Sequence, residues 1–112
     1  MQLEPGEQLV DLQFAGLRLI QNEKVLKFGT DSVLLASFIR LNRREKLVDL
    51  GTGTGILPIL LSGRVQAEMV GIELQPQAAE LARRNVQLNG LERVRIVQGD
   101  LKVWRYEATL GY

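Results

Sequence analysis

The 112-residue sequence contains no cysteine and no histidine. Without cysteine there is no disulfide and no thiolate nucleophile, and without histidine there is no Ser-His-Asp triad and no usual zinc site. We therefore expect no metal site, and no side chain is assigned as catalytic. Any chemistry of this chain must depend on carboxylates, backbone groups and a reactive cofactor.

The sequence also lacks long apolar runs and a strong charge of either sign. No run approaches the roughly 18 apolar residues of a membrane-spanning helix, and the N-terminus has no basic segment followed by an apolar one. The formal net charge is +1, and 24% of the residues are charged. These values predict one soluble, cytoplasmic domain or part of one, without a membrane partner, and they neither imply nor exclude nucleic-acid binding.

Three alternating glycines form the most informative stretch. The apolar run at 47–50 is followed by Gly51, Gly53 and Gly55 and then by a second apolar run, which predicts a strand, a tight turn and a helix. Glycine permits positive φ and lets a ligand approach the backbone, and the first N–H groups of a helix have no intrahelical partner. We expect a ligand at this turn; the alternative is a glycine-rich turn that binds nothing.

Two residues of this stretch favour a cationic ligand over a dinucleotide. The dinucleotide fingerprint requires glycine at the position of Ile56. Asp49 precedes the first glycine by two residues, where its charge would repel a pyrophosphate but could accept hydrogen bonds from an ammonium group.

The N-terminal third has weaker patterns. We interpret residues 7–14 as an arm or lid, and residues 17–21 and 25–28 as the two strands of a hairpin around a polar turn. A helix should begin at Thr30 or Asp31 and end between residues 40 and 42. Its apolar stripe contains Leu34, Leu35, Phe38, Ile39 and Leu41.

The remainder alternates between strands and helices. Helices are predicted at 55–62 and 76–89, with Arg83 and Arg84 facing outward, and strands at 67–73 and 94–97. This order predicts a Rossmann-like, doubly wound parallel sheet of the α/β class, with helices on both faces of the second strand. Its successive strands end in three acidic residues, Asp49, Glu73 and Asp100.

Two further sets of charged residues have open interpretations. Glu73 follows the glycines by about 20 residues, where a carboxylate can accept hydrogen bonds from ribose hydroxyls, or can simply be an exposed strand end. The basic cluster before the central strand is either a solvated loop or a phosphate-contacting patch. It contains Arg40, Arg43, Arg44 and Lys46.

The Asp-Leu-Gly-Thr-Gly-Thr-Gly string at 49–55 resembles motif I of class I S-adenosylmethionine (SAM) methyltransferases. The segment 27–35 resembles the bacterial tRNA adenine N6-methyltransferases and their "small domain" relatives. The resemblance extends over about residues 27–101 and implies SAM as cofactor, with Glu73 on the ribose and Asp100 on the adenine amino group. The implied cofactor contacts are Gly29, Thr30, Asp31, Asp49, Gly51, Thr52, Gly53, Gly55, Ile56, Glu73, Leu74, Asp100 and Leu101.

One departure from this family concerns the methyl acceptor. The amino-methylating members have an Asn/Asp-Pro-Pro-Tyr motif, whereas this chain has three isolated prolines and no Pro-Pro. We therefore expect a portion of a longer enzyme, inactive alone, with an N-terminal arm, hairpin and capping helix at 1–45 and the SAM-binding half at 46–112. Its first parallel strand would be an exposed edge that favours self-association.

The resemblance implies methylation of an exocyclic amino group in RNA, namely adenine N6 in tRNA. Methylation of rRNA, of a protein amide or of a small molecule remains an alternative, because the acceptor residues are missing. Two other classes also remain: a nicotinamide-dinucleotide-binding oxidoreductase module, and a non-catalytic domain that has kept the cofactor pocket.

Overall fold

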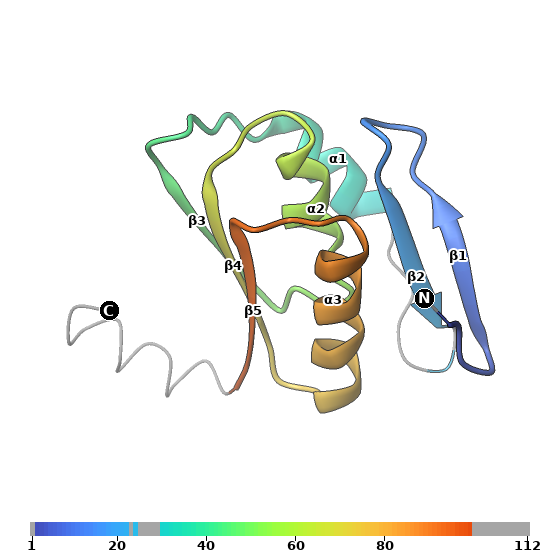
Figure 1. Cartoon of the computed structure of the whole chain (residues 1–112). Coiled ribbons are helices and arrows are strands. Elements are labelled where there is room, and N and C mark those ends of the chain that lie inside the picture. Colours follow the sequence, from blue (N-terminus) through green and yellow to red (C-terminus); the bar gives the residue numbers. More distant parts are fainter. Residues whose placement is uncertain (1, 23, 25–29, 100–112) are drawn as a thin grey trace.

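Three helices lie between a parallel sheet and an antiparallel hairpin (Figure 1). The computed structural model describes residues 2–22, 24 and 30–99. Their elements are β1 (Glu7–Asp11), β2 (Arg18–Asn22), α1 (Thr30–Phe38), β3 (Lys46–Leu50), α2 (Ile56–Ser62), β4 (Glu68–Glu73), α3 (Pro76–Leu88) and β5 (Val94–Gln98). The predicted α/β class with a parallel sheet is confirmed.

The parallel sheet has the strand order β3-β4-β5, and the connections between its strands contain α2 and α3. In its register Asp49 is paired with Gly71, and Glu73 is paired with Gln98. Because all three strands run in the same direction, their carboxyl ends form one edge of the sheet and their amino ends form the other. We call these the carboxyl edge and the amino edge.

Two apolar clusters hold the three layers together. The larger cluster joins the helices to the sheet, and its buried residues are Ala36, Leu57, Leu61, Met69, Ala79, Ala82, Val94 and Ile96. The smaller joins α2 to the hairpin and contains Leu17, Leu19, Ile56 and Ile59. Burial of such side chains supplies most of the driving force for folding.

The described helices lie on one face of the parallel sheet (Figure 1). Helices on both faces of the sheet were predicted, but within the described ranges all the helices lie on this one face. Among the described strands β3 is an outermost strand of the sheet, with a described neighbour, β4, on one side alone. Its residues Val48 and Leu50 are 39% and 54% exposed. The predicted exposure of the first parallel strand is therefore confirmed within the described part of the chain.

The hairpin differs from the prediction. The partner of β2 is β1, which lies in the segment interpreted as an arm, and residues 25–28 lie outside the described ranges. The turn falls at 13–16, where Gln13, Ala15 and Gly16 all have positive φ. Positive φ is uncommon for residues other than glycine, so the sequence contained little sign of this turn.

Helix α1 is shorter than predicted, and the stripe residues within it are exposed, whereas Ile39 and Leu41, which follow it, pack against the larger cluster. The helix ends at Phe38, whose side chain is 78% exposed, and Leu34 and Leu35 are each about half exposed. Ala36 is the residue that α1 contributes to the larger cluster. The apolar periodicity predicted the helix correctly but not the face that packs.

Within the described ranges, no helix combines the length and apolar character needed to cross a membrane.

An ion pair ties β1 to α3. The guanidinium of Arg84 donates hydrogen bonds to both carboxylate oxygens of Glu7, whose side chain is 4% exposed. The hydrogen bond from Arg84 lowers the pKa of Glu7, and the same contact raises the pKa of Arg84. The prediction that Arg84 faces solvent is therefore wrong, because the unanticipated β1 covers this part of α3.

Candidate functional site

The glycine turn folds back over the end of β4. Gly51, Gly53 and Gly55 have φ values of 73°, 58° and 84°, as expected for glycines in a turn of this kind. The backbone N–H groups of Gly51 and Thr52 both donate to the carbonyl oxygen of Ile72, at 2.8 and 2.9 Å. These contacts fix the turn at the carboxyl edge of the sheet.

Glycines around the turn have different physical roles. A Cβ on Gly55 would lie at ordinary van der Waals distance, 3.5 Å, from both Ala82 Cβ and Ile59 Cδ1, so glycine is favoured there by its φ of 84° and not by lack of space. A Cβ on Gly71 of β4 would lie 2.6 Å from Thr52 Oγ1, so Gly71 leaves the space that Thr52 occupies. By contrast, a Cβ on Gly51 would meet nothing within 4 Å. The turn is packed on its inner side and open at Gly51.

The carboxylate of Glu73 binds the turn itself. Its Oε1 accepts a hydrogen bond from Gly53 N at 2.9 Å, and its Oε2 accepts one from Gln75 N at 3.1 Å. Its carbonyl oxygen accepts a third from Gly99 N at 3.0 Å, which connects the ends of β4 and β5. Each carboxylate oxygen has a second lone pair, so Glu73 can brace the turn and still accept a hydrogen bond from a ligand.

Asp49 brings a second carboxyl group to this edge. It is half-buried at the end of β3, and burial raises its pKa. A side-chain hydrogen bond from Thr52 acts in the opposite direction, and the negative charge of Glu73 raises the pKa further. The two causes that raise the pKa reflect an unfavourable environment for a second anion. A cation bound between these two groups would relieve that cost, so the edge favours positively charged ligands.

Two buried hydroxyl groups lie in the turn. Thr52 and Thr54 are 3% and 1% exposed; the hydroxyl of Thr52 lies beside the carboxylate of Asp49, and the Oγ1 of Thr54 has no hydrogen-bond partner among the described residues. A buried polar group without a partner costs about 1–3 kcal/mol. Thr54 therefore has hydrogen-bonding capacity that a buried water can satisfy.

A family model described as "Methyltransferase domain" matches residues 47–109, which are 63 of the 112 residues. This chain belongs to the methyltransferase-domain family. The match begins in β3 and includes the whole glycine turn and the carboxyl edge.

Individual proteins are similar to this methyltransferase domain over part of their length. The tRNA1(Val) (adenine(37)-N6)-methyltransferase of Histophilus somni is 32% identical over 97 residues, which are 84% of this chain and 41% of that protein. An RNA methyltransferase from Salinibacter ruber, solved in complex with S-adenosyl-L-homocysteine, is 29% identical, with a TM-score of 0.56 and coverage of 69% of this chain and 52% of that one.

The M. jannaschii protein TYW2, solved in complex with AdoMet, has a TM-score of 0.74 and covers 89% of this chain and 46% of its own. At 21% identity that likeness concerns the fold alone. The methyltransferase domain described here thus spans about two fifths of the length of the curated relative.

Of the other predicted cofactor contacts, some lie at the carboxyl edge and some lie outside the described residues. Leu74 follows β4 directly and is 64% exposed beside the carboxyl edge. The side chain of Ile56 is buried against the hairpin, so only its backbone N–H, at the start of α2, is left to face a ligand. Thr30 and Asp31 begin α1, but their side chains lie outside the described part of the chain, as do Gly29, Asp100 and Leu101.

The sequence did not reveal the importance of Asn85. This α3 residue is fully buried, and its Nδ2 donates to Thr54 O and to Ile20 O, both at 3.0 Å. Its Oδ1 accepts from Ile20 N at 2.6 Å. One side chain thus links the glycine turn of the methyltransferase domain to β2. An asparagine on the buried side of a helix was the available signal, because buried polar groups nearly always have partners.

Proposed function

We propose that this chain binds SAM at the carboxyl edge and forms the cofactor-binding portion of a cytoplasmic tRNA adenine N6-methyltransferase. The RNA substrate is supported by the names of the relatives, which include tRNA1(Val) (adenine(37)-N6)-methyltransferases and an RNA methyltransferase. The cofactor is supported by the ligands named in the solved structures.

The observation that carries the proposal is a turn that hydrogen bonds fix at the carboxyl edge, with an open backbone at Gly51, beside two carboxylates. Asp49 would accept hydrogen bonds from the ammonium group of SAM, and the free lone pairs of Glu73 would accept them from the ribose hydroxyls. Leu74 supplies an exposed apolar surface for the adenine ring. The residues present therefore fit the cofactor.

Asp49 and Glu73 would hold SAM, whose electrophilic methyl group would be available for direct displacement from sulfur by the acceptor amine, with the amine proton leaving to solvent. The residues of this chain contribute position and charge, not a nucleophile. Because Asp49 and Glu73 attract a cation, they favour the charged cofactor over a product whose sulfur is neutral.

Calorimetric titration of the chain with SAM, S-adenosylhomocysteine and NAD tests the cofactor. We expect both adenosyl compounds to bind more tightly than NAD, because two acidic groups repel a pyrophosphate. Asp49→Asn should weaken SAM binding and leave NAD binding unchanged or improved. Tighter binding of NAD by the unaltered chain would contradict the proposal.

We propose the division at residue 46 as a functional one, in which 46–112 hold the cofactor and 1–45 cap it. The chain alone should transfer no methyl group to unmodified tRNA, since it has no Pro-Pro motif for the acceptor. A radiolabelled methyl-transfer assay measures this directly, and turnover would show that these 112 residues are sufficient.

Self-association through β3 follows from its exposed edge. An unpaired strand with apolar side chains is a template for pairing with another chain. We expect sedimentation velocity to show concentration-dependent association that Val48→Lys reduces. Val33→Lys is the matched control, because Val33 on α1 is 42% exposed and Val48 is 39% exposed. Equal effects of the two substitutions would exclude β3 as the interface.

A further inference from the structure

Four arginines line one open depression of about 750 Å³ at the amino edge of the sheet. Arg43 and Arg44 lie before β3, Arg64 lies before β4 and Arg93 lies before β5. The parallel topology therefore brings together arginines that are as many as 50 residues apart in the sequence. The remaining lining residues are Asn42, Val65 and Gln66.

No carboxylate lines this depression. Of the nearby acidic residues, Glu45 accepts a hydrogen bond from Asn42 N at 3.0 Å, and Glu68 is paired with Lys46 at 3.6 Å. All four arginines are exposed, and none of them forms an ion pair with another residue of the described ranges. Positive charge is thus concentrated at this edge, although the whole chain carries a formal charge of only +1.

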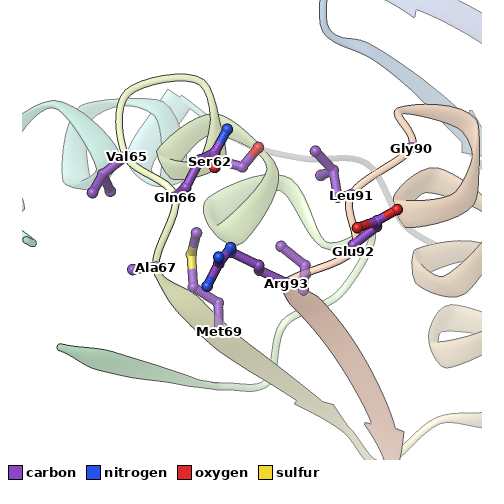
Figure 2. Close-up of a pocket in the computed structure, with 10 residues that line it drawn as sticks. Ser62, Val65, Gln66, Ala67, Met69, Gly90, Leu91, Glu92 and Arg93 are labelled. Carbon is purple, nitrogen blue, oxygen red and sulfur yellow. The ribbon is translucent and has the colours of Figure 1, made fainter. Parts of the chain in front are cut away.

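The depression has an organised border. The guanidinium of Arg64 donates hydrogen bonds to Ala36 O and to Ile39 O, which holds it at the C-terminal end of α1. On the other side, a smaller pocket of about 190 Å³ shares Val65, Gln66 and Arg93 with the depression. Figure 2 shows the side chain of Arg93 on the Met69 side of this pocket, while the neighbouring Glu92 points the opposite way.

This arrangement matches a phosphodiester backbone. Guanidinium groups donate in a planar fork that suits phosphate oxygens, and groups spread over three connections suit a polyanion better than a single small anion. We propose that the amino edge binds the phosphate backbone of the RNA substrate. The inference rests on the proposed function, because that function supplies RNA as the partner.

The two edges are close enough for one RNA to reach both. Strands of five or six residues separate them by about 17–20 Å at 3.3 Å per residue. The RNA backbone continues on both sides of a target base, so contacts at the amino edge can hold the substrate without approaching the cofactor. These contacts would supply affinity and position rather than sequence recognition.

The test compares two triple variants that lose the same charge. Arg43, Arg44 and Arg93 are changed to Ala together, and Arg64 is kept because it holds α1. The control changes Arg18, Arg83 and Arg95 to Ala, which removes three exposed charges from other surfaces. Fluorescence anisotropy with a labelled tRNA transcript is measured over a series of salt concentrations, beside calorimetry with SAM.

We expect the first variant to lose at least about tenfold in RNA affinity and its salt slope to fall by about 2–3, since each phosphate contact contributes roughly 0.7–0.9. Its SAM affinity should be unchanged. Loss of the same size in the control variant would overturn the proposal. Failure of SAM binding in the unaltered chain would count against the proposed function alone.

Two further arms keep the test decisive. In a separate variant the same three arginines are replaced by Lys, which preserves the charge. This variant should keep most of the RNA affinity of the unaltered chain, and it can be measured even if the Ala variant does not fold. Photo-crosslinking of the unaltered chain to thiouridine-substituted tRNA should label residues 42–44 and 93. Crosslinks confined to other surfaces, or equal binding to vesicles containing anionic lipid, would assign the amino edge to a different role.

Discussion

The two edges of the same three-stranded sheet differ in both charge and order. At the carboxyl edge the backbone is held by hydrogen bonds among the turn, Ile72 and Glu73, and its charged groups are acidic. At the amino edge the side chains are long, exposed and basic. A small cofactor needs a preformed site with few degrees of freedom, whereas a polyanion needs positive charge over a wide area. The parallel topology allows one sheet to provide both.

Substitution of Asn85 should have the largest effect. Asn85→Ala leaves three buried backbone groups without partners, which we expect to reduce the free energy of unfolding by about 3 kcal/mol or more, at roughly 1–3 kcal/mol per group. Urea denaturation measures the loss. Asn89→Ala is the control, because Asn89 bonds to Arg18 in a partly exposed position and should cost less. Equal losses in free energy of unfolding would show that the buried hydrogen bonds of Asn85 stabilise the fold no more than those of Asn89.

Substitution of Glu73 should change ligand binding at the carboxyl edge and not at the amino edge. Glu73→Ala should weaken SAM binding by about 1.5–3 kcal/mol, the range for hydrogen bonds to a charged group, and should leave RNA affinity at the amino edge unchanged. Calorimetry and anisotropy on the same preparation measure both. Glu80→Ala, on the exposed side of α3, controls for the loss of one negative charge. An unchanged SAM affinity in a folded variant would reduce Glu73 to a brace for the turn.

Acid should weaken the carboxyl edge through Asp49. Its pKa is raised above the ordinary value of 3.8 by burial, so it loses its charge at a higher pH than an ordinary aspartate does. A cation binds the ionised form better, so SAM affinity should decrease with falling pH through this raised pKa, by at most about tenfold per pH unit for one linked proton. Asp49→Asn should remove this dependence. If the pH dependence of SAM affinity persists in Asp49→Asn, it must come from another titratable group.

The smallest effect concerns neither edge. The pKa of Glu7 is lowered below 4.5 by Arg84, so their ion pair stabilises the fold above that pH and loses its contribution as the pH falls through the lowered value. Glu7 is nearly covered, but the side chain of Arg84 still reaches solvent at 20% exposure, so we expect the pair to contribute on the order of 1 kcal/mol. The stability difference between the unaltered chain and Glu7→Gln should shrink as the pH falls from the ordinary value of 4.5 through the lowered pKa of Glu7. Neither SAM nor RNA affinity at neutral pH should change in Glu7→Gln.

The sequence predicted the carboxyl edge because its signals are local. Gly51, Gly53 and Gly55 lie within five residues, and the acidic strand end at Glu73 follows one strand later. Helix α3 was also predicted closely, from Pro76 at its start and Gly90 after its end, where φ is +62°. Such features depend on backbone geometry that few residue types permit, so they can be recognised without knowledge of the fold.

The features that were missed depend on contacts between distant segments. Arg64 and Arg93 join Arg43 only after three strands have aligned, and the role of Asn85 depends on where β2 lies. The hairpin was misassigned because its turn uses positive φ at Gln13 and Ala15, which have no local preference for it. Periodicity identified α1 but could not show that Ala36 would be its buried residue.

The two asparagines that bind β2 also determine when the hairpin can dock during synthesis. Asn85 and Asn89 bond to Ile20 and Arg18 across 65 and 71 residues of sequence. At about 5–20 residues per second, the ribosome adds the partner residues of β2 roughly 3–14 seconds after β2 itself. Throughout that interval the docking edge of β2 has neither asparagine to bind, and an early-made strand with unpaired edge groups is the kind of segment that chaperones engage.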